Sequence, residues 1–202
     1  DRIGGVLAIG LILGSISGYF GGIVDEIIMR LTDIVLAIPG LILAMALVIA
    51  LGNDINSVML ALILVGWPMY ARVTRAQFLT IKQNDFVEAA IAAGCSHLRI
   101  IIRHILPNAI YPLLVLASLD VGAIVLSVAA LSFLGLGAPE GYADWGQLIS
   151  MSRNWIVGTP NDPFAYWYTY IIPGLFLFTF VVGWNLLGDG LRDIFDPMMR
   201  RK

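Results

Sequence analysis

Residues 110–134 read IYPLLVLASLDVGAIVLSVAALSFL, an apolar stretch in which Asp120 is the single charged side chain. An α-helix needs about 20 residues to cross the hydrocarbon core of a bilayer, which is about 30 Å thick. This stretch is therefore long enough and apolar enough to form one membrane span, and it predicts a helical membrane protein.

The composition of the whole chain supports this prediction. The chain has 202 residues, of which 59% are hydrophobic and 13% are charged. An average soluble domain has about 25% charged residues, so an integral membrane protein is expected. The 12 Lys and Arg residues form no basic stripe, which argues against a nucleic-acid-binding protein.

Four further runs resemble residues 110–134 in length and hydropathy. They are continuous and do not alternate with a period of two, which favours helices over a β-barrel. The third run is short and needs residues 72–78 as an extension whose charged ends reach the membrane surface. The fold expected is all-α, a polytopic transmembrane helical bundle with five spans, at residues 3–20, 34–51, 58–71, 110–134 and 170–187.

Glycine and proline mark special positions within these spans. Gly10, Gly14, Gly18 and Gly22 recur at every fourth residue, which clears one helix face for close approach by a neighbour. The alternative is that glycine is simply frequent in membrane helices. Kinks or helix starts are expected at four prolines, Pro39, Pro68, Pro112 and Pro173.

The basic residues predict the orientation of the chain. Ten of the twelve lie in segments that alternate to one side, which the positive-inside rule assigns to the cytoplasm. The segment 72–108, the segment 21–33 and the C-terminus are then cytoplasmic. An external start with five spans is what a six-span protein would show after losing its first helix.

The segment 138–169 is predicted to be an external, partly helical loop. It is rich in Trp and Tyr, which favour the membrane–water interface. Its acidic residues Glu140, Asp144 and Asp162 are either solvated loop charges or contacts for a soluble delivery protein.

A polar segment, residues 84–107, interrupts the apolar pattern and predicts a helix–turn–helix, here called the hairpin. Asp85 and Glu88 are spaced as a capping box at the start of a helix, with residues 86, 87, 90 and 91 as its apolar face. Gly94 permits a sharp turn, and Ser96 is suited to cap a second helix. A surface of small alanines could enter a groove on another protein, or the hairpin could pack back on its own spans.

The order Glu88-Ala89-Ala90, Gly94 and Leu106-Pro107 resembles the EAA loop of permease subunits of binding-protein-dependent ABC importers. That family has a type I importer permease fold, and this loop binds a groove of a cytoplasmic ATPase subunit. The resemblance implies an ATPase-coupling loop at 80–108 whose site residues are Glu88, Ala89, Ala90, Gly94, Leu106 and Pro107. His104 stands where the family has isoleucine.

Other segments resemble the dipeptide, oligopeptide and nickel branch of these permeases. They are the segments 19–22, 103–108, 131–137 and 185–193, the last followed by Asp196-Pro197. The resemblance implies one permease domain over residues 1–202 in the cell membrane. It implies as partners a second permease subunit, cytoplasmic ATP-binding subunits and an external solute-binding protein, with peptides as cargo and nickel or oligosaccharide as alternatives.

The sequence offers no catalytic site. It lacks the P-loop pattern, so ATP and magnesium are expected in a partner subunit and no cofactor in this chain. His97 and His104 lack carboxylate or cysteine partners at metal-ligand spacing, which argues against a metal site. We expect a transport subunit and no enzyme.

Asp120 is the candidate residue for the translocation path. An ionisable group at this depth is costly unless it faces water or the interior of the bundle, so it either lines the path or serves as a polar packing residue. An ion-driven secondary transporter is the alternative function, but it would show paired intramembrane charges and internal repeats. A scaffold protein without transport would leave the hairpin pattern unexplained.

Overall fold

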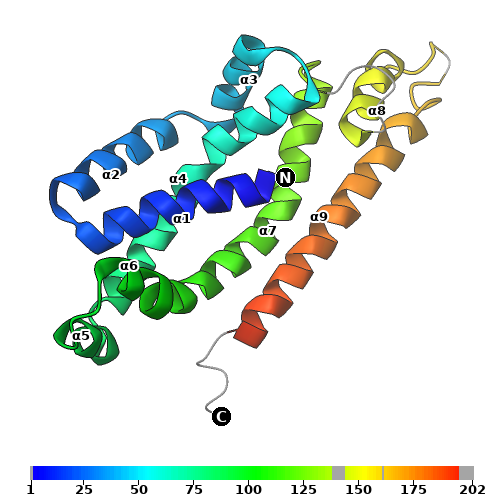
Figure 1. Cartoon of the computed structure of the whole chain (residues 1–202). Coiled ribbons are helices and arrows are strands. Elements are labelled where there is room, and N and C mark those ends of the chain that lie inside the picture. Colours follow the sequence, from blue (N-terminus) through cyan, green and yellow to red (C-terminus); the bar gives the residue numbers. More distant parts are fainter. Residues whose placement is uncertain (1, 138–143, 161, 196–202) are drawn as a thin grey trace. The chain divides into compact units, whose positions relative to one another are not determined.

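The computed structural model describes residues 2–137, 144–160 and 162–195. These residues form helices and include no named strand, which confirms the all-α prediction (Figure 1). The elements are α1 Arg2–Phe20, α2 Gly22–Leu36, α3 Gly40–Leu51, α4 Ile55–Ile81, α5 Asp85–Ala92, α6 His97–Arg99, a π-helical segment Ile100–Ile105, α7 Leu106–Phe133, α8 Trp145–Met151, a 3-10 segment Ser152–Trp155, and α9 Tyr168–Phe195.

The chain divides into two compact units, and each is described by itself. The first holds the described residues within Asp1–Gly40, Leu62–Ala117 and Arg192–Lys202, and the second those within Leu41–Ala61 and Ser118–Leu191. The long helices α4, α7 and α9 contribute residues to both units.

Four helical stretches in the described part of the chain are long and apolar enough to cross a membrane. They are Arg2–Phe20, Ile55–Ile81, His97–Phe133 and Tyr168–Gly190, and they confirm the first, third, fourth and fifth predicted spans. The third span extends well beyond residues 58–71, because α4 continues without interruption to Ile81.

The second predicted span, residues 34–51, is not one continuous helix, and the kink or helix start predicted at Pro39 is confirmed. Instead, α2 and α3 form a pair bent by 90° at a short break that contains Pro39. Proline lacks an N–H donor and disfavours a helical conformation in the residue before it, so the break falls where the sequence dictates. The segment 21–33 is mostly helix α2, and the predicted total of five spans holds if the bent pair counts as one.

The other three prolines lie inside helices that continue through them. Pro68 lies in α4, Pro112 in α7 and Pro173 in α9. No helix starts at these three prolines, and among the four positions only Pro39 lies at an interruption between helices.

In the first unit, the glycine face of α1 packs against α4. A Cβ atom at Gly14 would lie 2.5 Å from the carbonyl oxygen of Ala71, and one at Gly18 would lie 2.7 Å from Cβ of Phe78. Gly10 approaches Tyr70 in the same way, so the packing interpretation is confirmed for these three glycines. Gly22 does not belong to the face: it has φ +60°, a Cβ atom there would have nothing within 4 Å, and it is the first residue of α2.

Two ion pairs connect α2 with α4 in this unit. Arg75 donates from Nε to Oδ1 and from Nη2 to Oδ2 of Asp25, both at 2.6 Å, and Ser17 of α1 also donates to Oδ1. Arg72 donates from Nη2 to Oδ1 of Asp33 at 2.7 Å. The first pair is partly buried and the second is exposed, so the first is the structural one.

In the second unit, small residues again set the distance between helices. A Cβ atom at Gly188 of α9 would lie 2.6 Å from the side chain of Leu119 of α7, and one at Gly122 would lie 3.3 Å from Val181. The absence of side chains at these two glycines lets α7 and α9 approach closely. The predicted loop 138–169 contains α8 and the 3-10 segment, so it is partly helical as expected, while Glu140 lies outside the described residues.

Candidate functional site

The turn of the hairpin is built on Gly94. Gly94 has φ +75°, a left-handed conformation that glycine adopts without steric cost. Its N–H donates to the carbonyl of Ile91 at 2.9 Å, and the N–H of Cys95 donates to the carbonyl of Ala90 at 3.1 Å. These two bonds form a Schellman motif, which ends α5 and satisfies its last carbonyls.

One face of α5 packs into the first unit. Val87 is fully buried and Ala90 is 8% exposed, and both join a hydrophobic cluster formed with residues of α1, α4 and the π-helical segment. The cluster consists of Tyr19, Phe78, Ile81, Val87, Ala90, Ile100, Ile105 and Ala109. This burial fixes the orientation of α5 relative to the end of α4.

The opposite face of α5 is exposed. Glu88 and Ala89 lie there, and so do Ala92 and Ala93 at the end of the helix. The predicted apolar face is only partly right, because Phe86 is 44% exposed and Ile91 is 52% exposed. The helix therefore presents a surface of small residues with one carboxylate and two apolar side chains beside it.

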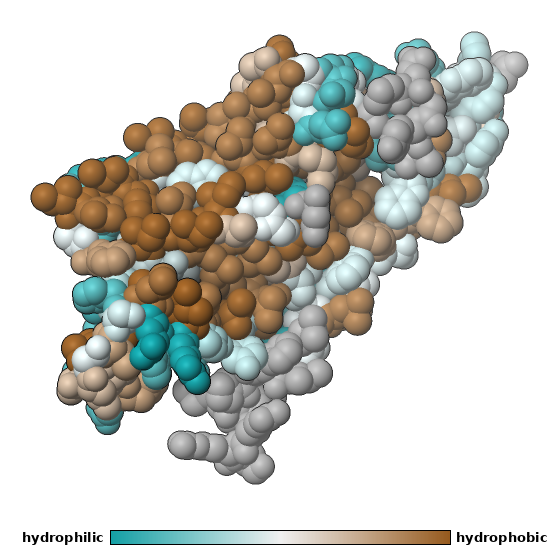
Figure 2. Space-filling model, viewed as in Figure 1, coloured by the Kyte–Doolittle hydropathy of each residue, from teal (hydrophilic) through white to brown (hydrophobic). Residues whose placement is uncertain are grey.

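Hydropathy along the surface follows the same division. Figure 2 shows hydrophobic residues over much of the visible face, while hydrophilic residues gather around the hairpin. Apolar side chains that are exposed on a bundle of membrane helices suit contact with lipid, whereas a mixed polar surface suits contact with water or another protein.

The predicted capping box is wrong in detail. Helix α5 begins at Asp85, but Asn84 occupies the N-cap position, with an extended backbone and no capping bond from its side chain. Asp85 and Glu88 instead both lie in the first turn, where negative charge is favoured by the helix dipole. Ser96 does occupy the N-cap position of α6, also without a side-chain capping bond.

The second half of the hairpin continues directly into a membrane-length helix. From His97 the chain forms α6, then the π-helical segment, and then α7 without a break, so Leu106 and Pro107 begin α7. Leu106 is partly buried against the hydrophobic cluster and Pro107 is exposed. Pro107 has no N–H to donate, so the continuous helical stretch lacks one backbone hydrogen bond directly after the π-helical segment.

Sequence reasoning missed a polar cluster where α1 meets the hairpin. The hydroxyl of Tyr19 is hydrogen-bonded to Nδ1 of His97 at 2.7 Å, and Nζ of Lys82 donates to the carbonyl oxygen of Tyr19 at 2.6 Å. We call Tyr19, Lys82 and His97 the Tyr19 cluster. Tyr19 stood in a recognised motif, but nothing in the sequence marked its pairing with a histidine 78 positions later.

Asp120 lies in the middle of α7 and is partly buried. It belongs to the second unit, whereas the predicted coupling residues, from Glu88 to Pro107, belong to the first. The hairpin and Asp120 are therefore two separate features, and the role of Asp120 in a translocation path stays a prediction.

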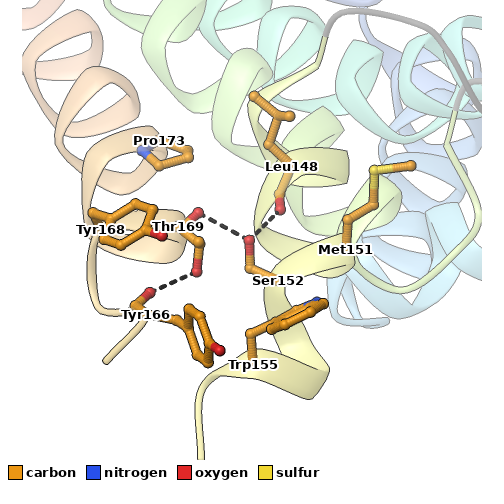
Figure 3. A pocket seen from close by; sticks show the side chains of 8 residues that line it. All are labelled: Leu148, Met151, Ser152, Trp155, Tyr166, Tyr168, Thr169 and Pro173. Atoms are coloured by element: carbon orange, nitrogen blue, oxygen red, sulfur yellow. Dashed lines mark hydrogen bonds between the residues drawn. The ribbon is translucent and has the colours of Figure 1, made fainter. Parts of the chain in front are cut away.

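A pocket of about 490 Å³ lies in the second unit between α8 and the start of α9. The hydroxyl of Ser152 lies between its two walls, 2.8 Å from the carbonyl oxygen of Leu148 and 2.9 Å from that of Thr169, and these two acceptors share its single proton (Figure 3). Its described lining is otherwise aromatic and apolar: Met151, Trp155, Tyr166, Tyr168 and Pro173. None of these described lining residues is an acid, a base or a cysteine, so they offer no charged recognition group.

Acidic, histidine and cysteine side chains do not gather elsewhere either. Within residues 2–137, 144–160 and 162–195, no three of them lie close enough to hold a metal ion. Cys95 is a free thiol and partly buried beside the hydrophobic cluster.

Comparison with known proteins agrees with this architecture. Residues 10–201 match the family model of the binding-protein-dependent transport system inner membrane component. The chain is 40% identical over 196 residues to the dipeptide transport system permease protein DppC of Alkalihalophilus pseudofirmus, which covers 97% of this chain and 62% of that protein.

Two further relatives come from Escherichia coli K12. The probable D,D-dipeptide transport system permease protein DdpC is 43% identical over 189 residues, covering 94% of this chain and 61% of that protein. The nickel transport system permease protein NikC is 40% identical over 192 residues, covering 95% and 67%. The chain thus spans less than two thirds of the length of the first two relatives. With a family match over nearly its whole length, the chain belongs to the family of inner membrane components of binding-protein-dependent transport systems.

Proposed function

We propose that this chain is a permease subunit of an ATP-driven importer, and that the outer face of the hairpin binds a separate ATP-binding subunit. The observation that carries the proposal is the two-sided construction of α5. Val87 and Ala90 fix one face in the hydrophobic cluster, while Glu88 and Ala89 are exposed on the other. A rigidly held helix with a small outer face is suited to enter a groove.

Coupling requires more than binding. A partner can shift the equilibrium between permease conformations only if it binds the hairpin differently in its two states. Because α5 follows α4 after a short turn and the π-helical segment leads directly into α7, a displacement of α5 acts on two membrane-length helices at once. The Gly94 turn connects α5, which follows α4, with the helical segment that leads into α7.

We place the hairpin and the C-terminus on the cytoplasmic side. The support is the charge distribution, since Arg72, Arg75, Lys82, Arg99 and Arg103 lie within or next to this region. ATP and magnesium then belong to the cytoplasmic partner, and this chain binds no cofactor. An aromatic-rich outer segment with α8 would face the solute-binding protein.

Small peptides are the proposed cargo, and a second permease subunit completes the path. The support is the names of the relatives, which are permeases for dipeptides and D,D-dipeptides, with nickel as the alternative. Asp120 is the residue we propose for the path, because a carboxylate could attract the amine of a peptide or a metal cation.

The test is retention of the ATP-binding subunit by the purified transporter. Ala89→Arg places a long cation on the exposed face of α5, and we expect loss of most of the co-purifying ATPase. Asn56→Arg is the matched control, because Asn56 is exposed in the first turn of α4, at the end of that helix away from the hairpin. Full retention in the Ala89 variant would refute this docking face, and uptake without any ATPase would favour the ion-driven alternative.

A further inference from the structure

The last turn of α1 is fastened to the polypeptide on both sides of α5. Tyr19 accepts a hydrogen bond from Lys82, which precedes α5, through its backbone carbonyl. Its side-chain hydroxyl is bonded to His97, which follows the Gly94 turn. One residue of α1 therefore holds both the segment just before α5 and the start of α6 after the Gly94 turn.

The surroundings of Tyr19 hold its ring, and therefore its hydroxyl, in one position. The residue is 5% exposed and belongs to the hydrophobic cluster. Nζ of Lys82 lies 5.3 Å from the centre of the Tyr19 ring, and the ring of His97 meets it edge to face at 5.6 Å. A ring that is held by packing and by a cation has little freedom, so its hydroxyl has a fixed position.

Movement of Tyr19 would be passed to the rest of α1. Gly14 and Gly18 hold α1 in close contact with α4 only a few residues before Tyr19. Close-packed helices resist sliding, because a small displacement brings backbone atoms into overlap. The Tyr19 cluster thus joins the hairpin to a helix pair that is itself tightly packed.

We propose that Tyr19 is a positioning residue that makes α1 and the hairpin move as one body when the ATP-binding subunit displaces α5. This inference rests on the proposed function, because it assumes that a partner acts on α5. The hydrogen bond between the Tyr19 hydroxyl and His97 is the part of the cluster that joins α1 to the half of the hairpin that follows the Gly94 turn.

Substitutions on the two sides of the Tyr19–His97 bond separate this role from simple core packing. Tyr19→Phe removes the hydroxyl and keeps the ring in the hydrophobic cluster. His97→Leu removes the ring nitrogen that is bonded to that hydroxyl, whereas His97→Asn keeps a polar group close to the Nδ1 position. A packing role predicts no effect of Tyr19→Phe, but a positioning role predicts the same defect in Tyr19→Phe and His97→Leu and rescue by His97→Asn.

The experiment measures a distance in the complete transporter with its ATP-binding subunits. Spin labels are placed at Ile12→Cys of α1 and Ile102→Cys of the π-helical segment, both exposed and both outside the proposed docking face, in a Cys95→Ser background. Pulsed electron paramagnetic resonance then gives the distance between the labels without nucleotide and with ATP trapped by vanadate. We expect the same single distance in both states for the protein with Tyr19 and His97 intact.

In Tyr19→Phe and His97→Leu we expect a second distance in the trapped state. The loss of one neutral hydrogen bond should raise its population about fivefold. His97→Asn should restore the single distance, and Tyr170→Phe, a hydroxyl deletion on α9, should leave it unchanged. One unchanged distance in Tyr19→Phe, or a distance that already changes with nucleotide in the intact cluster, would overturn the proposal.

Co-purification of the ATP-binding subunit is recorded for every variant. If the subunit is retained and the distances do not respond to Tyr19→Phe, the positioning role alone is refuted. If no ATP-binding subunit is found even with the hairpin intact, the proposed function is refuted and the positioning role with it.

Discussion

Arg75 of α4 holds Asp25 of α2 through two parallel hydrogen bonds of 2.6 Å, one to each carboxylate oxygen. The carboxylate side chain is 17% exposed, whereas that of Asp33 in the neighbouring pair with Arg72 is 58% exposed. The same two helices therefore carry one shielded and one solvated ion pair, which allows a matched comparison of their contributions to stability.

Asp25→Asn is expected to lower the free energy of unfolding by about 1–2 kcal/mol, because a partly buried guanidinium loses a charged, bidentate partner. Asp33→Asn is the control and should cost less than about 1 kcal/mol, as exposed ion pairs do. Thermal unfolding of the purified variants in one detergent measures the difference. Equal losses for the two variants would contradict the assignment of Asp25 as the structural partner.

Gly14→Ala should destabilise the packing of α1 on α4. The added Cβ would lie 2.5 Å from the carbonyl oxygen of Ala71, and a backbone atom cannot rotate away as a side chain does. Such overpacking typically costs about 1–3 kcal/mol. The same thermal unfolding measurement applies.

Gly183→Ala is the control for this substitution. Gly183 lies inside α9, and a Cβ atom there would have nothing within 4 Å in this chain. We expect no loss of stability, since alanine is the better helix former. If Gly14→Ala were equally harmless, the close approach between α1 and α4 would be wrong.

The sequence was sufficient to predict most helices and the glycine packing face. Hydropathy and length identify a membrane helix because crossing a bilayer has a fixed length requirement, and α1, α4, α7 and α9 follow from it. The turn at Gly94 was also predictable, because few residues other than glycine adopt its positive φ. Spacing of small residues then predicted which face of α1 packs, although not that α4 is its neighbour.

The angle between consecutive helices, the exact first residue of α5 and the contacts between residues far apart in the chain were not predictable from the sequence. Pro39 predicted a kink or a helix start, but residues 34–51 are uniformly apolar, so hydropathy could not give the size of the bend, which is 90°. Asn84 and Asp85 are both good capping residues, and the sequence could not decide which of them precedes the helix. The bond from Tyr19 to His97 depends on how α1 and the hairpin pack, which no local pattern encodes.

Gly94→Val should disrupt the hairpin through its backbone and not through a steric clash. The position has open space around it, since a Cβ atom there would have nothing within 4 Å, but its φ of +75° is unfavourable for a β-branched residue. We expect a loss of about 1–2 kcal/mol in the local stability of the turn. Faster protease cleavage between α5 and α6 would report it, together with reduced retention of the ATP-binding subunit.

Gly94→Asn separates the two explanations. Asparagine is larger than glycine but tolerates the left-handed conformation, so it should retain most of the coupling. If Asn and Val were equally damaging, added bulk at the docking surface would be the cause instead of backbone strain.

Asp120 provides a test of the translocation path that does not depend on the cargo. If its side chain faces a water-filled path, Asp120→Cys in a Cys95→Ser background should react with a hydrophilic maleimide, because thiol reactivity requires access and the thiolate form. The rate should differ between the nucleotide-free and the ATP-trapped transporter, since alternating access exposes the path differently. Leu126→Cys is the control: Leu126 is 50% exposed on the same helix but apolar, and a lipid-facing thiol there should stay unreactive in both states. If the Asp120→Cys thiol also remained unreactive in both states, Asp120 would be assigned to helix packing.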